Sequence, residues 1–168
     1  KNVLNNTYEF DSINLLKNPT EKEIITAFGN LKKLVHSEDN ILIFYAGHGY
    51  WNEEEQQGYW LPSNAEKSNS SNWIPNGTLR DKIRSFKNHH TLLLTDACFS
   101  GNFFNSSRST FEEQIAPYSA LYRLRARRAI TSGARNQKVP DKSVFIEYFI
   151  KKLQTNQRDI LTSREIYN

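Results

Sequence analysis

Two short, continuous apolar runs are the clearest hydrophobic pattern in the chain. Residues 41–45 read Ile-Leu-Ile-Phe-Tyr, and residues 91–95 read Thr-Leu-Leu-Leu-Thr. Unbroken runs of this length, ended by small residues, are typical of parallel strands that are covered on both faces. A helical pattern over residues 78–86 lies between them. The order of strand, helix and strand predicts a β-α-β crossover in an α/β fold.

The firmest helix prediction covers residues 21–35. Thr20 is followed three residues later by Glu23, which makes a capping box, and apolar residues then recur at helical spacing. The other predicted helices cover residues 111–124, 143–154 and 161–167. The other predicted strands cover residues 8–16, 58–62 and 128–133, and a Ser- and Asn-rich surface loop covers residues 63–72.

These elements fit one domain over residues 1–168, with a mostly parallel central sheet and helices on both faces. The chain contains no internal repeat and no second hydrophobic unit. It contains no Met, so its first residue is not an initiator. We therefore expect it to be a fragment of a longer polypeptide.

Composition excludes several classes of protein. The formal charge of +4 is mild for 168 residues and predicts no nucleic-acid partner. The single Cys allows no internal disulfide. No apolar run approaches the roughly 18 residues of a membrane-spanning helix, and the start lacks the apolar region of a signal peptide. We expect a cytoplasmic protein that binds no membrane.

The two apolar runs end in similar turns that carry reactive side chains. His48 lies in the turn Gly47-His48-Gly49, and Cys98 lies in Asp96-Ala97-Cys98-Phe99-Ser100-Gly101. Ligands bind beyond the carboxyl ends of parallel strands, where both turns are expected. An imidazole within reach of a thiol can take its proton and later return one to a leaving amine. The pair is therefore a candidate for nucleophilic catalysis.

Backbone groups of the same turns complete this hypothesis. The N–H groups of Gly49 and Cys98 can form an oxyanion hole, each donor contributing on the order of 3 kcal/mol to the transition state. The alternative is structural: a lone Cys after a strand is often an inert buried residue. A His in a Gly-His-Gly turn can also serve only to end a strand.

The two motifs resemble those of the caspase-like cysteine peptidases, which include caspases, metacaspases and bacterial relatives. Residues 45–49 look like the histidine motif of that group, and residues 96–101 look like its nucleophile motif in metacaspase form. The spacing between His48 and Cys98 is similar to that of caspases. Residues 58–62 and 129–133 resemble later strands of the same fold, so the resemblance covers nearly the whole chain.

The resemblance implies a three-layer caspase-like sandwich and a cysteine endopeptidase that works through a thioester acyl-enzyme. It implies His48 as general base and acid, Cys98 as nucleophile, and the Gly49 and Cys98 amides as the oxyanion hole. The first core strand of the family is missing from this chain and is expected upstream of it. Bacterial relatives often carry sensor domains and act in stress or defence, so a regulatory domain or an activating protein is a further expected partner.

The residue two positions before Cys98 predicts the specificity. Caspases have Gln there and cut after Asp, whereas this chain has Asp96. A carboxylate repels an acidic P1 side chain and attracts Arg or Lys, with Arg favoured through a bidentate pair. Alternatively, Asp96 only holds the turn. By the same resemblance Ser132 is a candidate pocket wall. Trp51, which follows just after the histidine loop, is a candidate for substrate contact.

Neither a metal nor a cofactor is predicted. Metacaspases are frequently activated by calcium, but the glutamates at 53–55 are consecutive and are not spaced as in a calcium loop. The basic run at 123–128 is expected to be solvated surface, and with Arg108 it offers targets for self-cleavage. The main rival function is a catalytically silent scaffold for regulated protein contacts.

Overall fold

The computed structural model describes residues 4, 8, 10–97, 122–132, 143–157 and 163–167. Its helices are α2 (Glu21–Leu34), α3 (Asn76–Arg84), α5 (Val144–Thr155) and α6 (Ser163–Tyr167), with the 3-10 helix η1 (Ser70–Asn72). Its strands are β1 (Asn40–Ala46), β2 (His48–Asn52), β3 (Gln57–Leu61), β4 (Ile74–Pro75), β5 (His90–Asp96) and β6 (Ala126–Thr131). The predicted α/β class is confirmed.

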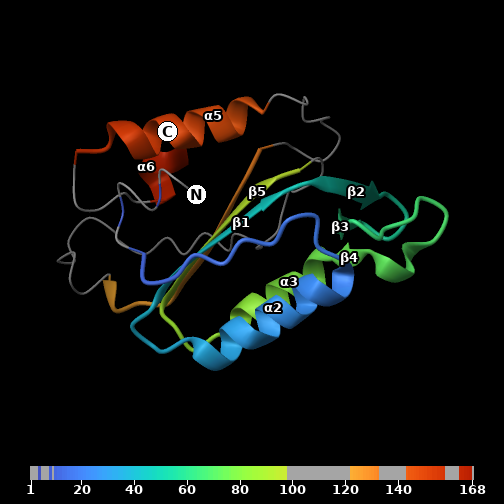
Figure 1. Ribbon diagram of the computed structural model, residues 1–168, viewed down its shortest axis with the longest axis horizontal. Helices are drawn as coiled ribbons and strands as arrows, with labels where there is room; N and C mark the ends of the chain where they lie inside the picture. The colour runs from blue at the N-terminus through green and yellow to red at the C-terminus, as the bar shows by residue number, and fades with distance from the viewer. Residues whose placement is uncertain are drawn as a thin grey trace.

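A parallel sheet forms the centre of the molecule. Its described strands have the order β1-β5-β6, and both neighbouring pairs are parallel. The helix α3 lies in the connection from β1 to β5, as the apolar runs predicted. Figure 1 shows this sheet between α2 and α3 on one side and α5 and α6 on the other. The expected three-layer arrangement is therefore present.

Two adjacent residues of β5 show how both faces of the sheet are covered. Leu93 belongs to a core cluster with residues of α2 and α3, whereas Leu94 belongs to a second cluster with residues of α5 and α6. Both leucines are 0% exposed. Successive side chains of a strand point to opposite faces, so a continuous apolar run is what a sheet between two helical layers requires.

The helix α2 begins as its sequence predicted. The Thr20 hydroxyl accepts a hydrogen bond from the Glu23 backbone N–H, and the Glu23 carboxylate accepts one from the Thr20 N–H. The Thr20 N–H lowers the pKa of the Glu23 carboxyl group below its ordinary value. Ile24 and Phe28 face the core from this helix, and Phe28 stacks on Phe86 beyond α3.

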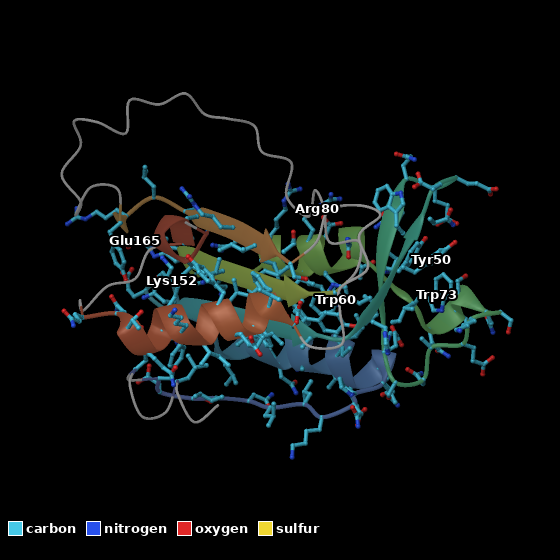
Figure 2. All side chains as sticks on the ribbon, turned by 90° about the horizontal axis from the view of Figure 1, so that it is seen from above. Tyr50, Trp60, Trp73, Arg80, Lys152 and Glu165 are labelled. Atoms are coloured by element: carbon cyan, nitrogen blue, oxygen red, sulfur yellow. The ribbon has the colours of Figure 1, made fainter. Side chains whose placement is uncertain are left out.

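A small antiparallel sheet, β2-β3-β4, follows directly after β1. The predicted strand at 58–62 corresponds to β3, but β2 was not predicted. The hairpin turn between them is held by the Asn52 side-chain oxygen, which accepts from the N–H groups of Glu54 and Glu55. Trp73 packs edge-on against Tyr50 (Figure 2) and also against Tyr59, so this tryptophan is part of the aromatic packing of the small sheet.

The predicted strand over residues 8–16 is wrong. The described part of this segment is irregular, and Leu15 and Leu16 are 54% and 42% exposed. Tyr8 attaches this segment to the fold: its hydroxyl donates to the Leu153 carbonyl at 3.0 Å and accepts from the Asn156 side-chain amide at 3.3 Å. Alternating residues specify a strand only where a neighbouring strand offers backbone partners, and none of the described strands pairs with this segment.

The basic run at 123–128 is not simply solvated surface, because Arg127 is half-buried. Its guanidinium donates to the backbone carbonyls of Ile83, Phe86, Asn88, His89 and Ala126. Burial lowers the pKa of Arg127, and the charge of Arg125 adds to this effect. Arg127 therefore ties the start of β6 to the end of α3, where the carbonyl groups of a helix favour a cation.

Other predictions have mixed outcomes. The predicted helices at 78–86, 143–154 and 161–167 correspond to α3, α5 and α6. Most of the predicted helix at 111–124, and Gly133 at the end of the predicted strand at 128–133, lie outside the described residues. In the part of the chain that the structure describes, no helix is long and apolar enough to cross a bilayer.

Candidate active site at the carboxyl edge of the sheet

The register between β1 and β5 relates the two candidate motifs. Each residue of β1 pairs with the residue fifty positions later, ending with Ala46 opposite Asp96. His48 lies two residues beyond Ala46, and Cys98 lies two residues beyond Asp96. Cys98 itself is outside the described residues, and the description ends at the buried Ala97. The chain thus leaves the same edge of the sheet at equivalent positions before each candidate residue.

His48 is exposed and is the first residue of β2. The turn before it is attached to the neighbouring strand, because the Gly47 N–H donates to the Asp96 carbonyl at 3.2 Å. Gly49 is half-buried and lies opposite Trp60 in the register of β2 and β3. The histidine turn is therefore held between the end of the parallel sheet and the start of the small sheet.

Tyr45 is a residue of this site whose contacts could not be predicted from the sequence. Its ring stacks on Trp60 with centroids 3.8 Å apart and planes 7° apart. Its hydroxyl donates to the His48 carbonyl at 2.7 Å. Figure 2 shows Trp60 close to the point where the two sheets meet. The only signal in the sequence was an aromatic residue at a strand end, which does not reveal a contact three residues ahead.

Gly47 has no side chain because Tyr45 occupies the space beside it. A Cβ atom at Gly47 would lie 2.7 Å from the Tyr45 hydroxyl oxygen and 2.8 Å from the ring carbon that carries it. Any other residue would displace the tyrosine or the turn. The glycine is thus explained by close packing under the histidine turn and not by an unusual backbone angle.

Asp96, at the end of β5, is a buried acidic residue. It is 6% exposed, and its Oδ1 atom has no hydrogen-bond partner among the described residues. The residue opposite it on β1 is Ala46, whose side chain is a single methyl group. A buried carboxylate oxygen without a partner carries an unfavourable desolvation energy.

Ser132 lies at the end of the next strand, close to Asp96 in the topology. Its N–H donates to the Thr95 carbonyl at 3.0 Å, and its hydroxyl oxygen is buried without a partner among the described residues. Trp51 lies three residues beyond His48 on β2 and packs against the larger core cluster. The structure therefore brings Ser132 to the same edge as Asp96. Trp51 is half-buried, and its contact with substrate stays a prediction.

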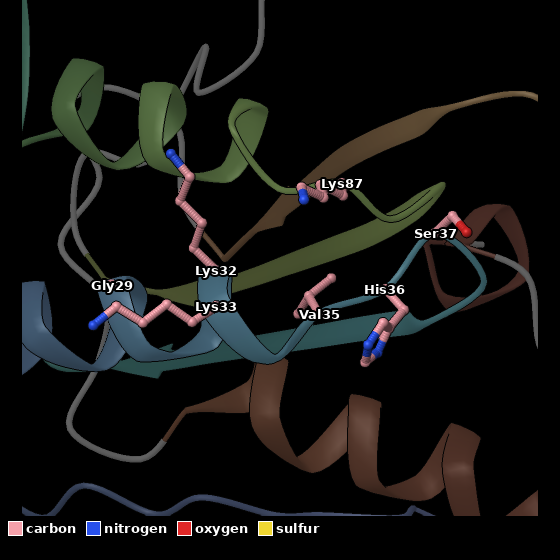
Figure 3. A pocket seen from close by; sticks show the side chains of 7 residues that line it. All are labelled: Gly29, Lys32, Lys33, Val35, His36, Ser37 and Lys87. Carbon is pink, nitrogen blue, oxygen red and sulfur yellow. The ribbon is translucent and has the colours of Figure 1, made fainter.

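A pocket at the other end of the sheet has a different character. It has a volume of about 800 Å³ and is lined by Gly29, Lys32, Lys33, Val35, His36, Ser37 and Lys87 (Figure 3). These residues come from the end of α2 and from the segments that enter β1 and β5. The candidate catalytic residues follow the carboxyl ends of the same strands, so this pocket is separate from the candidate active site.

Metal-binding side chains do not cluster in the described part of the chain. There, no group of three or more His, Cys, Asp and Glu side chains is arranged to bind an ion. The glutamates 53–55 lie exposed in the turn between β2 and β3. The Tyr59 hydroxyl donates to Glu55, and this hydrogen bond raises the pKa of Tyr59 to about 12.

Comparison with protein families agrees with this arrangement of the fold. Residues 1–166 match the family model described as the caspase domain, a family of peptidases. No individual curated protein matched the chain. The match covers both strand ends that precede His48 and Cys98, as well as all the described elements except the last residue of α6. The chain therefore belongs to the caspase-domain family of cysteine peptidases.

Proposed function

We propose that the protein is a cysteine endopeptidase that cleaves after Arg or Lys by means of a His48–Cys98 dyad. The observation that carries the proposal is the register of β1 and β5, in which Ala46 lies opposite Asp96. Because each candidate residue follows its strand end by two positions, His48 and Cys98 are expected to meet beyond the same edge of the sheet. Membership of the caspase-domain family supports this assignment.

The proposed reaction uses the two side chains in turn. His48 takes the proton of the Cys98 thiol, and the thiolate attacks the carbonyl carbon of the scissile peptide bond. The Gly49 and Cys98 N–H groups stabilise the oxyanion that forms. His48 then gives its proton to the leaving amine, which leaves a thioester on Cys98. Water activated by His48 hydrolyses the thioester and restores the thiol.

The P1 preference follows from Asp96. A substrate guanidinium can donate to the Asp96 carboxylate oxygen that has no partner among the described residues. The hydroxyl oxygen of Ser132, at the end of the adjacent strand, also has no partner within the described part of the chain and is an additional acceptor for the same group. Two acceptor sites favour the forked guanidinium of Arg over the single ammonium of Lys. An acidic P1 residue would be repelled.

Labelling with an electrophile tests the proposal directly. A peptidyl-arginine acyloxymethyl ketone is expected to modify the wild type once per chain, whereas a peptidyl-aspartate analogue reacts far more slowly. Since the chain has a single Cys, the labelled site is unambiguous. Cys98→Ala is the control and should remain unlabelled. An unlabelled wild type that still folds would support the silent scaffold instead.

Self-processing is a further part of the proposal. Arg127 and Arg128 lie within β6, in register with β5, and are therefore poor substrates for an extended cleft. Arg123 and Arg125 are exposed and precede that strand. We expect the wild type to cut itself after Arg123, Arg125 or Arg108, and intact-mass spectrometry should identify the fragments. If Cys98→Ala preparations contain the same fragments, the cleavage comes from another protease.

Regulation and partners complete the proposal. The substrates are proteins or peptides, and an attached sensor domain or an activating protein controls access to the site. The dyad itself needs no cofactor. The independence from metal ions is tested by measuring peptide hydrolysis by the chain alone in the presence of calcium and in the presence of a chelator. We expect equal rates.

A further inference from the structure

The residues beneath the histidine turn form a closed set of contacts. The ring of Tyr45 stacks on Trp60, and Trp60 lies opposite Gly49 in the register of β2 and β3. The Tyr45 hydroxyl returns to the turn and donates to the His48 carbonyl at 2.7 Å. The peptide unit between His48 and Gly49 is therefore contacted from two directions, by the paired strand β3 and by the side chain of Tyr45.

That peptide unit joins His48 to Gly49. A peptide bond is planar and trans, so the direction of the His48 carbonyl determines the direction of the Gly49 N–H on the opposite side. The Gly49 N–H is one of the two proposed oxyanion donors. A group that holds the carbonyl therefore also holds the N–H donor, although the two point in opposite directions within the peptide plane.

We propose that Tyr45 is a positioning residue that orients the Gly49 N–H for oxyanion stabilisation through its hydrogen bond to the His48 carbonyl. The inference rests on the proposed function, because it assumes that the carbonyl of a substrate binds at this turn. It assigns Tyr45 to the oxyanion hole and not to activation of the thiol.

Three features make the hydrogen bond persistent. The Leu61 carbonyl, at 3.5 Å, is a much poorer acceptor for the hydroxyl than the His48 carbonyl at 2.7 Å. Burial raises the pKa of Tyr45 above its ordinary value, so the hydroxyl keeps its proton at working pH. Gly47 has no side chain and so leaves room for the Tyr45 hydroxyl. A Cβ atom at Gly47 would lie 2.7 Å from the hydroxyl oxygen.

Tyr45→Phe removes the hydroxyl and keeps the stacked ring. We expect kcat on a peptidyl-arginine amide to fall by about 10- to 100-fold with little change in KM, since complete loss of an oxyanion donor costs roughly 10²- to 10³-fold. Inhibition by a peptidyl-arginine aldehyde, whose adduct carries a tetrahedral oxyanion, should weaken by a similar factor. Thermal unfolding is measured in parallel to confirm that the variant folds.

Alkylation by iodoacetamide separates this role from a general structural one. The Cys98 thiolate displaces iodide in that reaction, and no carbonyl oxygen becomes charged. The rate and its pH midpoint should therefore be the same in Tyr45→Phe and in the wild type. Gly47→Ala, which crowds the hydroxyl, should reproduce the loss of kcat. Tyr59→Phe is the matched control, because its hydroxyl bonds Glu55 in the exposed hairpin, and it should retain full activity.

The outcomes distinguish the inference from the proposed function. If Tyr45→Phe retains wild-type kcat, or if alkylation slows together with turnover, the assignment to the oxyanion hole is overturned and the peptidase proposal stands. If the folded wild type neither hydrolyses arginyl peptides nor shows a reactive thiolate, the peptidase proposal fails and the role of Tyr45 fails with it.

Discussion

Replacing His48 by Ala is expected to lower kcat by roughly 10⁴-fold or more, about as much as replacing Cys98, and the double variant should be little worse than either. The reason is that the two side chains act as one unit: the thiol is a weak nucleophile until the imidazole takes its proton. The measurement is peptidyl-arginine hydrolysis by Cys98→Ala, His48→Ala and the double variant.

The pH dependence of alkylation gives an independent view of the same pair. The proposed dyad predicts that a protonated His48 stabilises the Cys98 thiolate, so that alkylation proceeds at lower pH than for a free thiol. In His48→Ala the alkylation midpoint should rise to about 8.5, the value of a free thiol. His36→Ala is the control, because His36 is exposed and lies at the other end of the sheet. Additive losses, or an unchanged midpoint, would contradict a dyad.

The parts of the fold that could be predicted are those in which local signals agree with the tertiary structure. The run at 91–95 became β5 because a strand covered on both faces favours adjacent apolar residues, here the three leucines between Thr91 and Thr95. The Thr20 and Glu23 capping box marked the start of α2. The parallel register of β1 and β5 was not predicted residue by residue, but topology alone predicted that the strands before the two reactive turns end at one edge of the sheet, as the pairing of Ala46 with Asp96 shows.

The errors have a common physical cause. The strand β2 is a polar and aromatic segment without clear alternation, and it is a strand because β3 pairs with it after a tight turn in which Gln56 has a φ of 49°. In the segment at 8–16, by contrast, apolar and polar residues alternate, but the segment pairs with no described strand and forms none. Strand formation depends on a partner, and a single segment carries no information about its partner.

The candidate site shows the same limit. His48, Gly49, Cys98 and Asp96 could be named from two motifs, since their residue types imply chemistry. The role of Tyr45 could not, because it depends on a stacking partner fifteen residues away and on space vacated by Gly47. Arg127 was misjudged for a similar reason: a basic run predicts solvent exposure until the carbonyls at the end of α3 provide acceptors.

The Asp96 side chain provides the second large expected effect. Asp96→Asn keeps the shape of the residue and removes its charge. We expect kcat/KM on P1 Arg substrates to fall by about 10²- to 10³-fold, because a buried charge pair that loses one partner costs roughly 3–5 kcal/mol. The loss on P1 Lys substrates should be smaller, since an ammonium makes no bidentate pair.

Substrates with a neutral P1 residue are the internal control for this variant. They make no ion pair with Asp96, so their already low kcat/KM should change by only a few-fold. Asp11→Asn is the matched variant, because Asp11 is exposed in an irregular segment, and it should leave all substrates unaffected. The two roles considered for Asp96 differ here: a pocket residue changes the ratio between Arg and neutral substrates, whereas a residue that only holds the turn lowers both equally. Equal losses would therefore exclude Asp96 as the specificity determinant, even in a fully active peptidase.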